Sequence, residues 1–393
     1  MSLLRPFICA VLIAAVSFVA AAEPFVPESD GQVLERLPFG SSDPVIRHLR
    51  LQQTRLNREP DNLPLALRVA RGYLELGRAS GDPRYGGYAE AALVRWWQLE
   101  RPPQEVLVLR ATLHQRLHEF DAALADLATV LSANPRDVQA RLTRATVLQV
   151  QGAYESAREE CRALQNISQQ LVWVACLASV NGATGKLHES YRQLRSASEN
   201  HPNAQPEVRS WVLTSLAEMA ARADMTEEAE THFRAALGLD AADTYLLSAY
   251  ADFLLDSQRS REVLALLRDK TRADPLLLRY ALGLQAQRSK ELSGRVEQLR
   301  DRFAASRLRG DRVHLREEAR FTLHLQNAPE AALKLAQENW LIQKEPADVR
   351  ILLEAALAAH DDGSVGAVRE WLQRSGLEDE QLKRLAPETE HPR

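Results

Sequence analysis

The chain has 393 residues, of which 45% are hydrophobic and 26% are charged, and its formal net charge is −4. This is the composition of a folded globular protein. The net charge argues against a generally basic nucleic-acid-binding protein, because phosphate contacts need clustered cations. Seventeen glycines and 18 prolines are few for this length, and a large β-sandwich or barrel would show denser turn signals. The composition therefore favours an all-helical fold.

The segment from Met1 to Ala22 has the pattern of a secretory signal peptide. Arg5 is its only charge, and an uncharged, mostly apolar run from Pro6 to Ala22 ends in three alanines before Glu23. A membrane anchor is the alternative, but a spanning helix needs about 20 apolar residues. We therefore predict cleavage after Ala22 and export, with the periplasm as the expected compartment. Residues 23–43 are predicted to be loop-like. No later run is long and apolar enough to predict membrane insertion.

Small residues recur at a fixed interval through the rest of the chain. Ala111 and Ala145 are one such pair, and Ala217 and Ala251 are another, separated by the same interval. Within one unit a second small residue follows on the next helix, as Ala123 follows Ala111. A period of about 34 residues is typical of a solenoid in which each repeat is a pair of helices. Prolines that would end helices close several of the units, namely Pro60, Pro135, Pro202 and Pro275.

This register resembles the tetratricopeptide repeat. Five units carry it, and they begin at Gln104, Val138, Leu171, Ser210 and Thr244. The Trp usual at position 4 and the Gly usual at position 8 are absent. The resemblance implies an all-α fold, a right-handed α-solenoid of about nine antiparallel helical pairs. We expect this array to span residues 44–376, with a C-terminal cap and tail at 377–393. The further helices predicted outside the five units are 44–57, 63–76, 85–99, 276–288, 292–307, 313–325, 329–342, 347–359 and 365–374.

The sequence shows no convincing catalytic or metal-binding set. It contains neither G-x-S-x-G nor H-E-x-x-H, and the run from Gly182 to Lys186 lacks the spacing of a phosphate loop. His114 and His118 could share one helix face, but the register places no third ligand beside them, and a metal site needs three or four. We therefore predict a non-enzymatic protein without a cofactor.

In tetratricopeptide arrays the first helix of each unit lines the inner face. The family's carboxylate-binding version has Lys, Asn and Arg at fixed inner positions, and this chain does not have them. We therefore expect a partner protein or an extended peptide along this face, with the chain acting as a scaffold or adaptor in the cell envelope. The candidate contact residues are Thr112, Arg116, Thr146, Gln149, Trp211, Glu218, Arg222, Tyr245 and Asp252.

The first helical pair contains an unusual turn. The run from Gly77 to Tyr88 is longer than a tetratricopeptide turn and is rich in Arg, Tyr and Gly. One interpretation is a recognition loop, which would make the protein a small-ligand or polysaccharide-binding module. The other is an extended turn that folds back over the end of the solenoid. The candidate loop residues are Arg78, Asp82, Arg84, Tyr85 and Tyr88.

Two cysteines remain once Cys9 is removed with the signal peptide. The register places Cys161 on the second helix of one unit and Cys176 on the first helix of the next, and these helices pack antiparallel. Facing residues on packed helices can come within the Cα distance of about 7 Å that a disulfide allows. We predict a Cys161–Cys176 disulfide, which an oxidising compartment would preserve. The alternative is that both are small buried thiols.

Overall fold

The computed structural model describes residues 44–308, 310 and 313–385. The predicted signal peptide, the loop-like segment at 23–43 and the tail from residue 386 lie outside these residues. The helices described below belong to one compact unit.

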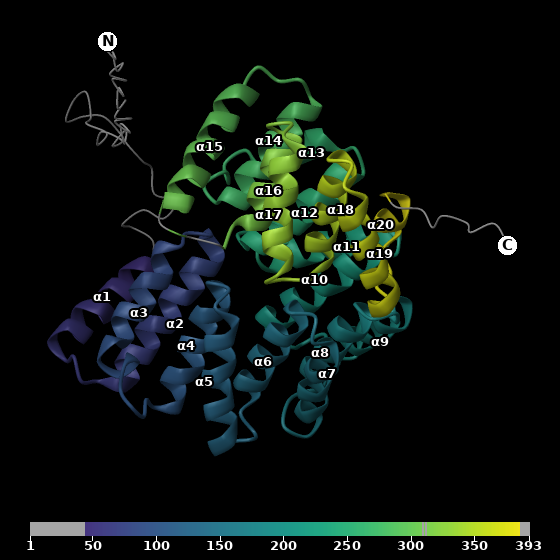
Figure 1. Ribbon diagram of the computed structural model, residues 1–393. Helices are drawn as coiled ribbons and strands as arrows, with labels where there is room; N and C mark the ends of the chain where they lie inside the picture. The colour runs from purple at the N-terminus through teal and green to yellow at the C-terminus, as the bar shows by residue number, and fades with distance from the viewer. Residues whose placement is uncertain (1–43, 309, 311–312, 386–393) are drawn as a thin grey trace, which may run out of the picture. The chain divides into compact units, whose positions relative to one another are not determined.

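The described residues are all-helical and contain no strand, which confirms the predicted fold class (Figure 1). None of their helices is both long and apolar enough to cross a bilayer. The first ten are α1 (Pro44–Arg58), α2 (Leu63–Ser80), α3 (Arg84–Trp97), α4 (Gln104–Arg116), α5 (Phe120–Ala133), α6 (Val138–Val150), α7 (Tyr154–Ala163), α8 (Gln170–Gly182), α9 (Leu187–Glu199) and α10 (Pro206–Arg222). The others are α11 (Thr226–Leu239), α12 (Thr244–Asp256), α13 (Ser260–Leu267), α14 (Asp274–Ala286), α15 (Leu292–Leu308), α16 (Leu315–His324), α17 (Pro329–Trp340), α18 (Pro346–Ala358), α19 (Asp362–Ser375) and α20 (Glu380–Leu385).

Consecutive helices pack as pairs, beginning with α2 and α3 and ending with α18 and α19. Within the described residues this makes nine pairs, with α1 before the first and α20 after the last. The first helix of each pair also packs against the first helix of the next, as α12 does against α14 and α16 against α18. An α-solenoid is built in this way, because one pair cannot bury its apolar faces alone.

The repeated small residues lie where the two helices of a pair meet. Ala111 on α4 and Ala123 on α5 are fully buried, and so are Ala217 on α10 and Ala229 on α11. A methyl side chain lets two helix backbones approach closely, and larger apolar residues then fill the space between neighbouring pairs. Phe233 on α11 fills such a space. The predicted register is therefore the register of the core.

Cys161 and Cys176 form the predicted disulfide. Their Cα atoms are 5.4 Å apart, and the bond joins α7 to α8 across a repeat boundary. Position 6 of a repeat points partly outward in the family, yet Cys176 is only 6% exposed and packs in one cluster with Cys161 and Val180. The 3-10 turn Leu164–Asn166 brings the chain back to start α8.

The long turn predicted in the first pair is wrong. Helix α2 continues to Ser80 and α3 begins at Arg84, so the turn is residues 81–83. Gly77 does not end the helix. It is buried within it, and a side chain there would meet the Arg116 guanidinium at 3.3 Å. The helix ends at Gly81, whose φ of +63° suits glycine and whose N–H donates to the Gly77 carbonyl.

This short turn lies against the middle of the array. Arg78 forms ion pairs with Asp240 and Asp243, at the corner between α11 and α12. Asp82 pairs with Arg272, just before α14, at 3.0 Å. The first pair thus contacts helices that follow it much later in the chain. This agrees with an interpretation as a turn that folds back on the solenoid, although it reaches the middle of the array and not its end.

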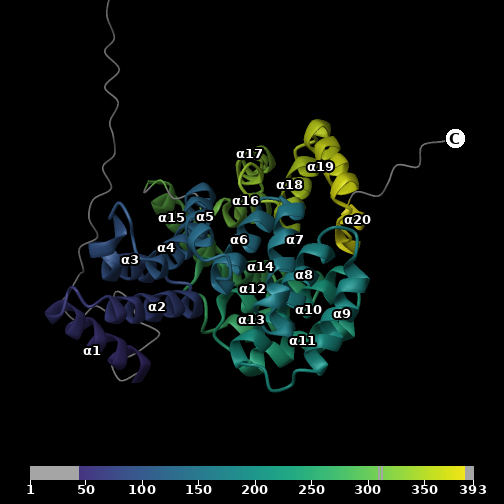
Figure 2. The same cartoon turned by 90° about the horizontal axis from the view of Figure 1, so that it is seen from below.

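The last pairs also contact earlier repeats, at the turns inside four successive pairs. Figure 2 shows α19, α20 and α9 at the same edge of this unit, where Gly376, between α19 and α20, approaches Gly185 in the turn between α8 and α9. The contacts are Gln343 with His118, the Lys344 N–H with the Val150 carbonyl, the Leu187 N–H with the Glu378 carboxylate, and Arg384 with Asp224. The solenoid is therefore joined to itself from both ends.

Candidate partner-binding face

The inner face of α4 and α6 is polar, and its hydrogen bonds are made within the chain. Thr112 and Thr146 donate their hydroxyls to carbonyls one turn earlier in their own helices. Gln149 donates to the Ser179 hydroxyl at 3.0 Å. Arg116 donates to a backbone carbonyl of α2 at 2.9 Å, and burial lowers its pKa. The last two of these predicted contact residues therefore link neighbouring first helices of the array.

The inner face of α10 and α12 carries two exposed aromatic side chains. Trp211 on α10 is 37% exposed, and Tyr245 on α12 is 56% exposed. The Tyr245 hydroxyl donates to Glu218 Oε1 at 2.6 Å, which ties α12 to α10. Glu218 lies two helical turns after Trp211 on the same helix. The structure thus brings together three of the predicted contact residues, and we call them the Trp211–Glu218–Tyr245 face.

Charged groups from three other positions act on Glu218. Burial is the main reason that its pKa rises to about 7, and the Glu345 carboxylate before α18 raises it further. The hydrogen bond from Tyr245 and the guanidinium groups of Arg222 and Arg316 oppose this rise only in part. The Glu218 charge in turn raises the pKa of the Tyr245 phenol well above its ordinary value. Glu218 therefore changes its charge near neutral pH.

The negative charge of Glu345 is also only partly neutralised. Arg316 lies 3.0 Å from it, but the same guanidinium also reaches Asp348 at 3.4 Å. Burial and the Asp348 charge raise the pKa of Glu345. Arg222, the remaining candidate on α10, donates to the Gly182 carbonyl at 3.0 Å. Each guanidinium on this face is thus shared with other groups of the chain.

Asp252, the predicted contact residue on α12, has a different environment. Arg279 reaches it at 2.7 Å and Arg320 at 2.6 Å. Burial opposes its ionisation, but these two guanidinium groups outweigh burial and hold its pKa at about 2. Arg279 is itself buried and also pairs with Glu317 at 2.8 Å. Asp252 is therefore part of a largely buried ion-pair network that holds α12, α14 and α16 together.

The charged residues of the predicted loop site are used in ion pairs within the chain. Arg78 pairs with α11–α12 as described, and Asp82 pairs with Arg84 at 2.7 Å as well as with Arg272. The two tyrosines lie on the adjacent surface. Tyr85 and Tyr88 pack with Tyr73 of α2 in a three-ring cluster, with centroids 5.4–6.1 Å apart. Tyr73 falls within a predicted helix, and no local sequence signal links it to the loop site.

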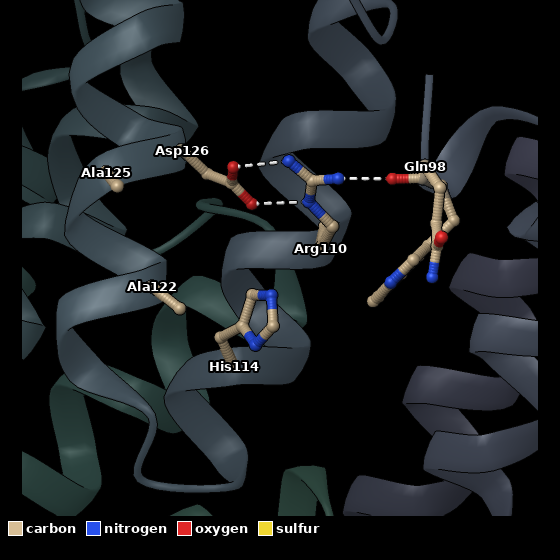
Figure 3. Close-up of a pocket in the computed structure, with 7 residues that line it drawn as sticks. Gln98, Arg110, His114, Ala122, Ala125 and Asp126 are labelled. Atoms are coloured by element: carbon tan, nitrogen blue, oxygen red, sulfur yellow. Dashed lines mark hydrogen bonds and ion pairs between the residues drawn. The ribbon is translucent and has the colours of Figure 1, made fainter. Parts of the chain in front are cut away.

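A cavity of about 380 Å³ lies between α3, α4 and α5. Figure 3 shows Arg110 with both bonds to Asp126, at 2.6 and 2.7 Å. Arg110 also donates to the Trp97 carbonyl and lies 5.7 Å from the Trp97 ring centroid. His114 pairs with Glu119 at 2.5 Å. Arg110, Asp126 and His114 thus have partners within the chain, and the Arg110 bonds stabilise the junction between the first two pairs.

His114 and His118 do not converge. His118 accepts from Gln343 at 3.2 Å, away from the Glu119 partner of His114. Burial lowers the pKa of His118 to about 4. No group of three or more His, Cys, Asp and Glu side chains in the described part of the chain is placed to hold a metal ion.

Comparisons with known proteins found similarity only among solved structures. No protein-family model matches the chain, and no curated protein matches it. The chain is similar to a tetratricopeptide repeat protein from Parabacteroides merdae, at 11% identity and a TM-score of 0.38, over 74% of this chain and 97% of that one. It is also similar to yeast Tom70, at 12% identity and a TM-score of 0.37, over 84% and 88% of the two chains. The P58(IPK) TPR domain matches at 16% identity and a TM-score of 0.22, over 88% and 99%. The helix pairs and their register in this chain are what identify the tetratricopeptide-like solenoid.

Proposed function

We propose that this protein is a non-enzymatic scaffold that binds a partner protein or an extended peptide along the inner face of its solenoid. The N-terminal pattern supports an exported protein, with the partner in the cell envelope. N-terminal sequencing of the secreted or periplasmic material tests the location: we expect Glu23 as the first residue. Retention of Met1 in a membrane fraction would contradict it.

One observation carries the proposal. Trp211 and Tyr245 project from adjacent first helices and remain 37% and 56% exposed, although the other predicted contact residues bond within the chain. Large aromatic side chains contribute more binding energy than other residues at protein interfaces, because they bury much surface with little loss of conformational freedom. They are the best anchors that this face offers to a partner.

Photo-crosslinking tests this function directly. Tyr245 is replaced by a benzophenone amino acid, the protein is crosslinked in cells, and the crosslinked peptide is sequenced. We expect one partner segment, and we expect Trp211→Ala to reduce its yield at least about 5-fold, because an anchor contributes more than about 1 kcal/mol. The matched control carries the same amino acid at Leu341, which is 80% exposed at the end of α17. Equal crosslinking from both positions would contradict the proposal.

A second candidate function uses the first helical pair as a small-ligand or polysaccharide site. The specific observation in its favour is the Tyr73–Tyr85–Tyr88 cluster, in which Tyr88 is half exposed. Because Arg78 and Asp82 are used in ion pairs within the chain, the first helical pair offers a ligand mainly its tyrosine rings. Binding of soluble glycans by the wild type that is lost in Tyr88→Ala would favour this function.

A further inference from the structure

We propose that the Trp211–Glu218–Tyr245 face binds a cationic side chain, a Lys or Arg, carried by the partner segment. This inference rests on the proposed function and names the chemistry of the partner.

The geometry of the face suits a cation. Tyr245 directs its hydroxyl to the Glu218 carboxylate at 2.6 Å, so a phenol ring and a carboxylate lie side by side. Trp211 lies two helical turns from the same carboxylate, about 10 Å along α10. Ring faces attract a cation through their quadrupole, and a carboxylate provides the charged partner. Tyr245 is 56% exposed, so a ligand can reach part of this residue.

The charge balance favours a cation over an anionic or neutral partner. Two guanidinium groups, those of Arg222 and Arg316, act at this face, and each faces several carboxylates. Arg222 also faces Glu378 and Asp379, and Arg316 also faces Glu345, Asp348 and Glu317. Neither guanidinium is therefore available to Glu218 alone, in a partly desolvated region where charges interact more strongly than in water.

The pKa shifts agree with this balance. Burial raises the pKa values of Glu218, Glu345 and Asp379, so each would gain from a cation nearby. A bound Lys or Arg would stabilise the ionised form of Glu218. The groups that face Glu218 are Tyr245, Arg222, Glu345 and Arg316, and the two arginines among them do not offset its burial.

The test uses defined peptides and the signal of Trp211. The full mature chain is labelled with 5-fluorotryptophan, and the Trp211 resonance is assigned with Trp211→Phe. A blocked Gly-Ser peptide with three lysines is titrated in, and peptides with three glutamines or three glutamates serve as comparisons. We expect a saturable shift of the Trp211 resonance with the lysine peptide alone. We also expect tighter binding at pH 8 than at pH 6, because Glu218 ionises near pH 7.

Two variants separate this site from general attraction to an acidic protein. Glu218→Gln keeps an acceptor for the Tyr245 hydroxyl and should weaken lysine-peptide binding about 10-fold, the usual size of one charge-assisted contact. Glu227→Gln removes the same charge from the exposed start of α11 and should change the affinity less than about 2-fold. Equal effects of both variants, or a Trp211 resonance that responds equally to the glutamine peptide, would overturn the inference.

The crosslinking experiment above distinguishes this inference from the proposed function. A partner segment that crosslinks at Tyr245, contains no Lys or Arg, and is unaffected by Glu218→Gln would overturn the cation site and leave the scaffold function standing. A lysine peptide that binds at Trp211 in a protein that captures no partner segment would overturn the scaffold function. A crosslinked segment with a Lys or Arg, lost in Glu218→Gln, would support both.

Discussion

Glu218 and Asp252 occupy the same position of the repeat in neighbouring units, on α10 and α12. Both are carboxylates on the inner face, yet the pKa of Glu218 rises to about 7 and that of Asp252 falls to about 2. The two carboxylates also meet different residues on the first helix of the next pair: one is neutral and the other is positively charged. Glu218 meets Tyr245, and Asp252 meets Arg279, which occupies the position of Tyr245 in the next unit.

The residue at the second position of the repeat is thus one difference between the closed and the available parts of the inner face, and Arg320, which also reaches Asp252, is another. Where the second position of a repeat is arginine, the preceding carboxylate is neutralised and the two helices are joined by an ion pair. Where it is tyrosine, the hydrogen bond remains but the positive charge does not, and an aromatic ring is left exposed. We call the contact between two neighbouring helices of the array a step. The α12–α14 step is therefore a structural junction, and the α10–α12 step is the one suited to a partner.

Removal of the arginine should break the structural junction and produce the largest effect. Arg279→Met removes the cation that Asp252 and Glu317 share; Asp252 keeps Arg320, but the buried Glu317 loses its close partner, and loss of one partner from a buried pair costs about 3–5 kcal/mol. We expect a loss of this size in the free energy of unfolding, measured by urea denaturation followed by circular dichroism. Arg234→Met, which removes an exposed pair with Glu230, should have little effect. Similar losses for both variants would show that the network is not a junction.

The α7–α8 step is joined covalently and offers a second comparison. The double variant Cys161→Ala/Cys176→Ala should lose about 3 kcal/mol of unfolding free energy, because the disulfide joins cysteines separated by 15 in sequence. Reduction should destabilise the wild type by a similar amount and leave the double variant unchanged. Thiol labelling of the denatured, unreduced mature chain is expected to find no free thiol, and two free thiols per chain would refute the bond.

A variant in the turn of the first pair tests whether the contact of this turn with the middle of the array stabilises the protein. Gly81→Val places a Cβ 2.6 Å from that of Ala273 and forces a β-branched residue to a φ of +63°. We expect a loss of about 2–3 kcal/mol. Gly87→Ala, in an open position of α3, should be neutral or slightly stabilising. If Gly81→Val unfolds like the wild type, the turn does not hold the two regions together.

The repeat register predicted the local parts of this arrangement and missed the long-range parts. It placed Cys161 opposite Cys176, and it put Trp211, Glu218 and Tyr245 on one face, because the repeat period decides which side of a pair a residue occupies. It did not predict that Glu345, which lies far later in the chain just before α18, would act on the Glu218 carboxylate. Such neighbours depend on the rotation accumulated over several pairs, and no local pattern encodes it.

The first pair shows a second limit. In the sequence, the glycines from Gly77 onward indicate a long turn, but Gly77 is a helical residue at a close approach to Arg116. In sequence the two roles look alike, because glycine serves both at turns and where another chain segment comes near. Only the position of α4 against α2 distinguishes them.

The smallest predicted effect is a pH dependence that separates the two carboxylates. The pKa of Glu218 in the folded protein is about 7, above its ordinary value of 4.5, so its ionised form is disfavoured by folding. Its contribution to stability is therefore present at acidic pH and is lost as the pH rises through about 7. We expect Glu218→Gln to raise the free energy of unfolding by up to about 2 kcal/mol at pH 8 and to change it little at pH 5.

Asp252 should behave in the opposite sense. Its pKa of about 2 lies below the ordinary value of 3.8, so its contribution is present above pH 4 and is lost as the pH falls through about 2. Asp252→Asn should therefore destabilise the protein at pH 7.

The decisive variant is Tyr245→Arg, which copies the α12–α14 contact into the α10–α12 step. If the facing residue determines the state of the carboxylate, Tyr245→Arg lowers the pKa of Glu218 and abolishes the loss of stability between pH 5 and pH 8. If that loss persists, burial and the Glu345 charge raise the Glu218 pKa whichever residue faces it, and the difference between Tyr245 and Arg279 does not explain why the two steps differ.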